Sequence, residues 1–464
     1  MAGLTASGIG SGLDISGLVS QLMSLEQRPL TALATKEASF QAKLSAYGQL
    51  KSVLSNFQSA ADKLDDSALF AATKASVSTG AAFSATSSTT ATAGGYSVEV
   101  LALAREQRIA TSATSTFAPA AGNLTITFGS VSGGVFTPGA ESPKTLNFTG
   151  STLAEFRDAI NEADLGVTAS IVNNGSAEQL VLKGASTGAA QAFEISGTTG
   201  LTYDPTVAGT SSDSVYRLAA AQDAQVDVDG IVVSRATNTL DDVIDGVTLT
   251  LAKAEPGTTS TLTVAADKSG ATSAINAFVK AYNDLNTTIK NLTAFNAETR
   301  SAATLTGDST ARSIQTQLRT MFGDTLSGLT GANRLSDIGI SFARDGTLSV
   351  DSSKLATALA DDTLDVASFF AGNGTTMGLA SRVSERIDGF IGTDGLISGR
   401  TDGINSSIKS LDKQREALTR RLEQIEARYL AQFTALDSLV ASFTQTSNYL
   451  TQQLATLPGA SSST

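Results

Sequence analysis

The feature that most constrains the fold is a heptad repeat of apolar residues near the C-terminus. One line of the repeat is apolar at seven of eight positions: Ile408, Arg415, Leu422, Tyr429, Leu436, Phe443, Leu450 and Leu457. The second line is apolar at five of eight: Ile404, Leu411, Leu418, Ile425, Gln432, Leu439, Thr446 and Gln453. This a and d pattern predicts a coiled-coil helix over residues 404–457, about 80 Å long at ~1.5 Å per residue. A helix that long must leave a compact domain and find a partner outside it. Because the polar interruptions gather late in the repeat, we expect its last part to be weakly ordered when alone.

The N-terminal region carries a shorter apolar stripe. Spacings of three, four and three residues place four side chains on one face of a helix: Ile15, Leu18, Leu22 and Leu25. Asp14 precedes the stripe as an expected N-cap, and Pro29 predicts a break or a kink. A second helical pattern follows from Leu33 to Leu64, and a core-packing role for it is favoured over an inter-subunit seam.

The sequence pattern in the middle of the chain predicts β-structure. Of the 20 residues 76–95, 18 are Ser, Thr, Ala or Gly, so this stretch is either a flexible linker or a pair of weak strands. Alternating segments follow at 96–100, 124–128 and 224–228, and one capped helix is expected at 152–160. The pattern over residues 76–267 therefore predicts one or two mostly-β domains.

Helical spacing returns after Lys268. Apolar residues spaced three and four apart predict a helix from Ile275 to Leu292. A strand pair is expected at 338–340 and 348–350, with an Asp-Gly turn between its strands. The expected fold class is α+β and multidomain: terminal coiled-coil legs, a helical stalk, and one or two mostly-β head domains inserted between them.

The composition of the chain excludes most kinds of catalytic site. The chain has no histidine and no cysteine, which excludes histidine-based triads, zinc–histidine sites, thiolate nucleophiles and iron–sulfur clusters. The remaining motifs are weak. Residues 8–12 are glycine-rich but follow no strand, Asp227 and Asp229 lack the glutamate of a calcium loop, and adjacent carboxylates at 241–242 point apart. We expect no enzyme activity, no metal and no cofactor.

Charge and hydropathy limit the partners. The formal net charge is −12, and residues 120–260, with 16 acidic and 6 basic side chains, contribute −10 of it. An acidic chain repels phosphate backbones, so nucleic-acid binding is not expected. No apolar run approaches the ~18 residues of a membrane span, so membrane insertion is not expected. The first basic residue is Arg28, which argues against a conventional cleaved signal peptide.

Five blocks of sequence, in order, resemble the flagellar filament cap proteins (the FliD, or hook-associated protein 2, family). The first is 10–19, GSGLDISGLV, and the last is 428–437, RYLAQFTALD, followed by 449–454, YLTQQL. Between them lie ATNT at 236–239 with GVTLTL at 246–251, FVKAYN at 278–283 and DGTL at 345–348. The resemblance covers essentially the whole chain.

The resemblance implies a structural protein at the distal tip of the bacterial flagellum. It would form a homo-oligomeric ring of four to six subunits, retain exported flagellin and promote its folding and insertion. It would leave the cell by the flagellar type III pathway and meet an export chaperone beforehand, with a host surface as a further candidate partner. The alternatives are another axial flagellar protein (flagellin or a hook–filament junction protein) and a surface adhesin.

In that family the two chain ends together form a helical leg that points into the filament. The two apolar patterns near the chain ends are therefore the candidate assembly seam, the surface through which the leg binds its partners. The expected seam residues are Ile15, Leu18, Leu22, Leu25, Leu411, Leu418, Leu422, Ile425, Tyr429, Leu436, Leu439, Phe443 and Leu450. The expected domains are a terminal leg that is mobile in the free protein (1–40 with 432–464), a stalk (41–75 with 268–431), a β-rich head (76–112 with 213–267) and an outer β-rich head with one helix (113–212).

Overall fold

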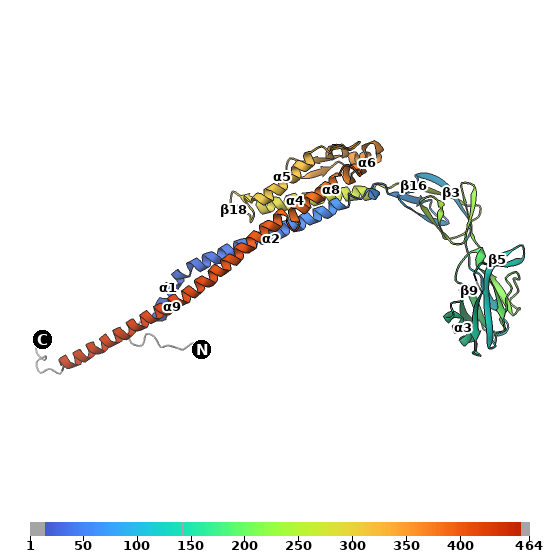
Figure 1. Cartoon of the computed structure of the whole chain (residues 1–464), viewed down its shortest axis with the longest axis horizontal. Helices are drawn as coiled ribbons and strands as arrows, with labels where there is room; N and C mark the ends of the chain where they lie inside the picture. Colours follow the sequence, from blue (N-terminus) through green and yellow to red (C-terminus); the bar gives the residue numbers. More distant parts are fainter. Residues whose placement is uncertain (1–13, 142, 456–464) are drawn as a thin grey trace. The chain divides into compact units, whose positions relative to one another are not determined.

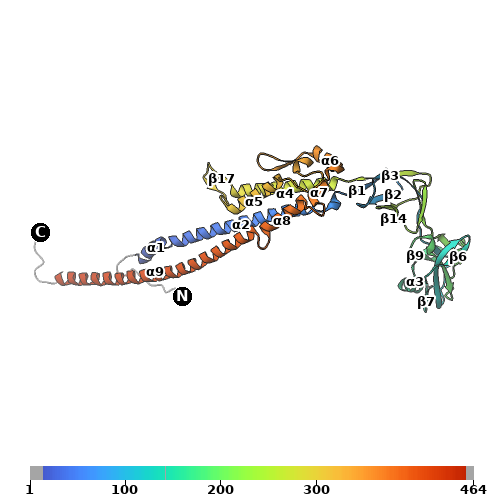
Figure 2. The ribbon, with the colours of Figure 1, turned by 45° about the horizontal axis from the view of Figure 1, so that its top comes forward.

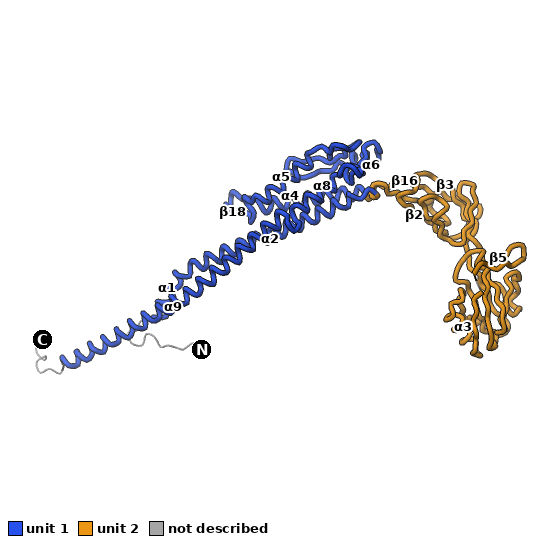
Figure 3. Tube along the Cα trace, viewed as in Figure 1, with its two compact units in different colours: residues 1–67, 271–464 blue, residues 68–270 orange. Residues whose placement is uncertain are grey.

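The computed structural model describes residues 14–141 and 143–455. The chain divides into two compact units, residues 1–67 with 271–464 and residues 68–270 (Figure 3). The glycine-rich segment 8–12, the block at 10–13 and Leu457 lie outside the described residues. The predicted α+β architecture is confirmed: both chain ends form the helical unit, and the mostly-β unit is inserted between them. The finer boundaries at residues 40, 112, 213 and 432 stay predictions.

Helices dominate the first unit. Their bounds are α1 Ile15–Glu26, α2 Arg28–Asp62, α4 Ser269–Thr293, α5 Ser309–Gly323, α6 Ser352–Ala360, α7 Val366–Ala371, α8 Leu379–Ile391 and α9 Leu396–Ala455. The predicted long helix is confirmed as α9, which has 60 residues and begins eight residues before the predicted start. Figures 1 and 2 show α1 and α2 running along it. Gln27 separates α1 from α2, so Pro29 lies in the first turn of a new helix, where its missing N–H is not needed.

The core of this unit is aromatic. Phe57 of α2 packs on Phe278 of α4 with ring centroids 5.1 Å apart, and Tyr282 meets Phe322 of α5 at 5.2 Å. Tilted and edge-on pairs of this kind add to the burial of apolar area. The C-terminal half of α2 is buried here, which confirms its predicted role as a core helix.

The predicted strand pair is shifted at its first strand. Residues 335–338 form a short 3₁₀ helix, and the strands are β19 Ile340–Phe342 and β20 Leu348–Val350. Gly339 ends the 3₁₀ helix with φ of 83°, a left-handed conformation that interrupts a strand. A small hairpin, β17 Phe295–Asn296 with β18 Ser301–Ala302, follows α4.

The inserted unit contains two separate apolar cores. The first lies in a five-stranded antiparallel sheet of order β1-β16-β3-β12-β13 and a three-stranded sheet of order β14-β15-β2. These strands are β1 Thr73–Val77, β2 Phe83–Ser87, β3 Gly94–Ala102, β12 Ala224–Val228, β13 Ile231–Arg235, β14 Thr239–Ile244, β15 Val247–Leu251 and β16 Thr259–Ala266. The Ser/Thr-rich segment therefore forms weak strands, one of its two predicted alternatives, because β16 and β15 supply their hydrogen-bond partners.

The second core lies between two four-stranded sheets and one helix. One sheet has order β11-β4-β9-β8, and in the other β5 pairs with β6, β7 and β10. The elements are β4 Arg108–Thr111, β5 Gly122–Ser132, β6 Val135–Pro138, β7 Lys144–Phe148, α3 Leu153–Glu162, β8 Val167–Asn173, β9 Glu178–Gly184, β10 Ala192–Gly197 and β11 Val215–Ala219. Helix α3 confirms the predicted helix. Thr152 and Glu155 form a capping box at its start, and Phe156 reaches the core.

Of the helices in the described ranges, none combines the length and the apolar character that crossing a bilayer requires.

Candidate functional site

The seam between the two chain ends begins with the packing of α1 on α9. Ile15, Val19 and Met23 are buried against Leu422 and Ile425. Partly buried neighbours complete the cluster: Leu30, Leu418, Tyr429 and Phe433. Each α1 contact is four residues from the next, so one narrow face of α1 is covered by this protein's own C-terminal helix.

The predicted α1 stripe is divided by this packing. Ile15 is buried and Leu22 is half-buried, whereas Leu18 is exposed and Leu25 is 53% exposed. The sequence analysis missed Val19 and Met23, although their four-residue spacing from Ile15 is an equally good helical pattern. Whether Leu18 and Leu25 contact another molecule stays a prediction.

Asp14 is the N-cap of helix α1, as predicted from the sequence. The Asp14 carboxylate accepts hydrogen bonds from the Ser16 hydroxyl at 2.7 Å and the Gly17 N–H at 2.8 Å. These two bonds lower the pKa of Asp14 below its ordinary value. A capped start orients α1 so that Ile15 enters the cluster.

The first half of the predicted α9 seam lies inside the protein. Leu411, Leu422 and Ile425 are buried, and Leu418 and Tyr429 are half-buried. Their partners are α1 and α2, which both contact α9. These positions therefore hold the two chain ends together in a single copy.

The second half of the α9 seam has a different environment. Four predicted seam residues are exposed here, by between 44% and 64% of their surface: Leu436, Leu439, Phe443 and Leu450. Tyr449 and Leu454, which were not among the predicted site residues, are exposed with them. A continuous helix carrying this many exposed large apolar side chains is typical of a surface that binds another protein.

The acidic side chains of the described residues have local structural roles. Within residues 14–141 and 143–455, no three potential acidic metal ligands cluster. The lowered carboxylate pKa values have local structural causes: at Glu155 they are hydrogen bonds from Ser151 and Thr152, and at Asp242 a hydrogen bond from Arg235. Such groups serve as helix caps and surface ion pairs.

Two family models match this chain. The N-terminal model of flagellar hook-associated protein 2 matches residues 11–107, and the C-terminal model matches residues 221–445. Flagellar hook-associated protein 2 of Escherichia coli K12 is 37% identical over 98% of both chains. The A-type flagellar hook-associated protein 2 of Pseudomonas aeruginosa is 35% identical with the same coverage.

This chain belongs to the flagellar hook-associated protein 2 family.

The structure agrees with that membership. The crystal structure of the D1-D2-D3 domains of the flagellar cap protein FliD from Escherichia coli is similar with a TM-score of 0.62 and 36% identity, covering 78% of this chain and 99% of that one. The resemblance recognised from the five sequence blocks is thereby confirmed, and the chain is a structural, flagellum-associated protein. The alternatives of flagellin, a junction protein or a surface adhesin are not favoured.

Proposed function

We propose that this protein caps the distal end of the flagellar filament, where it retains exported flagellin and promotes its folding and insertion. The observation that carries the proposal is the exposed apolar stripe at the end of α9, from Leu436 to Leu454. Exposed apolar surface of this kind is typical of a binding site for another protein, and membership of a flagellar family supports a partner in the flagellum.

The seam acts in two parts. Its inner part, where α1 and α2 cover α9, holds each leg together. Its outer part, centred on Leu436 and Phe443, binds neighbouring subunits and the inner lining of the filament. This binding is weak because a cap must be released and reseated each time a flagellin subunit is inserted.

The proposed assembly is a ring of four to six identical subunits at the filament tip. Each subunit reaches the tip through the flagellar type III pathway after binding an export chaperone. The role is structural and not catalytic. The Ser/Thr-rich surface of the head provides contacts between subunits, and a host surface is a further candidate partner.

The test is the double substitution Leu436→Asp with Phe443→Asp. Both side chains lie on one face of α9, seven residues apart, so two carboxylates would have to be desolvated when the cap seats. Both residues are exposed in the single chain, so its melting temperature should not change. Cells carrying the variant should shed unpolymerised flagellin and swim poorly.

A matched control puts the same charges on the other face of the same helix. Thr434 and Gln445 are exposed and lie about 160–180° around α9 from Leu436 at ~100° per residue. The Thr434→Asp with Gln445→Asp variant should grow normal filaments. Normal filaments and retained flagellin in the Leu436→Asp, Phe443→Asp strain would show that the stripe does not anchor a cap.

A further inference from the structure

The hairpin β17–β18 presents an aromatic side chain without an apolar covering. Phe295 is 59% exposed and makes no ring contact with the described part of the chain. The hairpin is nevertheless well braced. Asn296 accepts hydrogen bonds from the N–H groups of Glu298 and Thr299 at 2.9 and 3.0 Å, and Leu305 anchors its base in the core. An ordered, exposed aromatic residue loses little entropy on binding, which is typical of an interface anchor.

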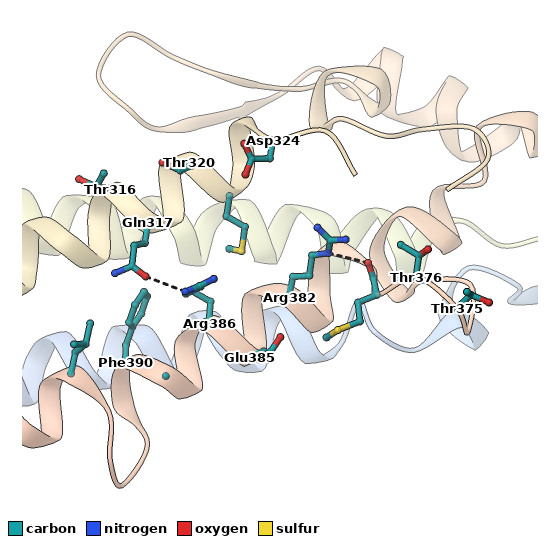
Figure 4. A pocket seen from close by; sticks show the side chains of 14 residues that line it. Thr316, Gln317, Thr320, Asp324, Thr375, Thr376, Arg382, Glu385, Arg386 and Phe390 are labelled. Atoms are coloured by element: carbon teal, nitrogen blue, oxygen red, sulfur yellow. Dashed lines mark hydrogen bonds between the residues drawn. The ribbon is translucent and has the colours of Figure 1, made fainter. Parts of the chain in front are cut away.

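A groove of about 1060 Å³ lies between α5 and α8 in the same unit (Figure 4). Its apolar part includes Met321, Met377 and Phe390. Thioether side chains adapt to an incoming ring and make favourable sulfur–aromatic contacts. The groove is therefore suited in size and chemistry to a protein segment that carries one large aromatic side chain.

The charges of the hairpin and the groove complement each other. Near the tip of the hairpin, Glu298 and Arg300 form no ion pair with any described residue. The groove offers Arg382 and Arg386 for the glutamate and carboxylates for the arginine. Among the described residues, each groove guanidinium group donates one hydrogen bond, Arg386 to the Gln317 side chain and Arg382 to the Met377 carbonyl, both at 3.2 Å. Both guanidinium groups thus keep donors for an incoming carboxylate.

The hairpin and the groove occupy different places on one copy. The hairpin precedes α5, whereas the groove flanks the C-terminal half of that 15-residue helix, which is about 22 Å long at ~1.5 Å per residue. Two complementary patches at separate sites on one subunit give a head-to-tail contact between copies, and such contacts form a ring when the rotation from copy to copy closes.

We propose that the β17–β18 hairpin of one copy inserts Phe295 into the α5–α8 groove of the next copy. This inference rests on the proposed function, because it assigns one subunit contact to the proposed ring. Glu298 then faces the groove arginines, and Arg300 faces Asp324 and Glu385.

Two pairs of variants test the contact by native mass measurement of the full chain over a range of concentrations. Phe295→Ala removes the anchor, and its control, Phe295→Tyr, keeps an aromatic ring at the same exposed position. Gly389→Trp fills the groove, and its control is Gly389→Ala. A Cβ at Gly389 meets no atom within 4 Å, so a side chain can begin there without a clash, and the melting temperature of each variant checks that the single copy still folds. The two test variants should raise the concentration for half-assembly about tenfold or more, and the controls should change it less than about twofold.

Cross-linking then identifies the occupant of the groove. Because the chain has no cysteine, Ala297→Cys on the hairpin and Thr320→Cys in the groove are unique reaction sites for a short bis-maleimide. The double variant should give a ladder of linked copies, whereas each single variant should stay unlinked. An assembled particle without the ladder would overturn this contact and leave the cap function standing. Linkage to added flagellin in place of a second copy would overturn the proposed occupant. A chain that stays monomeric throughout would overturn the ring itself.

Discussion

Arg415 of α9 donates a hydrogen bond to Glu37 of α2, with Nη1 2.5 Å from Oε2. Arg415 is the polar residue that interrupts the first heptad line. The Glu37 side chain is only 15% exposed, and Asp412 contacts the same guanidinium group at 3.0 Å. A polar pair at such a position sets the register of one helix on the other.

Breaking this pair should destabilise the packing of α2 on α9. Arg415→Leu leaves the Glu37 carboxylate without its partner, so we expect a loss of about 1 kcal/mol in the free energy of unfolding. Arg415→Leu with Glu37→Leu should recover that loss, because two apolar side chains then continue the heptad pattern. Denaturant unfolding of the wild type, both single variants and the double variant gives the coupling energy. A coupling energy of zero would show that the pair does not stabilise this register.

The division of the α1 stripe predicts unequal effects of two substitutions. Met23→Ala removes a buried side chain from the α1–α9 cluster and should destabilise α1 docking by about 2–3 kcal/mol. Leu25→Ala changes an exposed residue two positions away, and its effect should be within about 0.5 kcal/mol. Amide hydrogen exchange of α1 measures this local opening directly. Equal effects of the two changes would mean that α1 does not use the face seen here.

The N-cap of α1 predicts a pH dependence. Hydrogen bonds from Ser16 and Gly17 lower the pKa of Asp14 in the folded protein. Its contribution is therefore fully present above the unfolded pKa, near pH 4, and is lost as the pH falls through the lower folded pKa. Exchange of the α1 amides, corrected for intrinsic rates, should accelerate over that range. The Asp14→Asn variant keeps an N-cap side chain without a titrating carboxylate, so this acid transition should disappear. A transition that persists in the variant would show that another group causes it.

Proteolysis of the free protein should distinguish the two parts of the seam. A protease-resistant core of about 41–431 is expected if both chain ends are mobile. Because α1 packs into an apolar cluster on α9, we expect cleavage to begin C-terminal to Phe433 and residues 15–26 to be cut later. Mass analysis of the early fragments gives this order. Early loss of α1 would show that its cluster opens readily in the free chain.

Local chemistry was sufficient to predict many elements from the sequence. The heptads that cross Leu411 and Leu422 identify α9, because a 3.5-residue period is a property of the segment itself. Thr152 and Glu155 mark the start of α3 for the same reason, since a capping box involves only neighbouring residues. The absence of histidine and cysteine limited the chemistry, and the ordered blocks identified the family.

Only the tertiary structure decided which of several equivalent faces is covered. Ile15 belongs to two helical stripes, one through Leu18 and one through Val19, and it is the position of Leu422 and Ile425 that selects the second. Strand β2 has a weak pattern of its own and is paired by β15, which lies more than 150 residues further along the chain. The sequence by itself determined which segments are helical and which residues are apolar, because periodicity is local. The choice of buried face and of strand partner required the fold, because burial depends on residues that are distant along the chain.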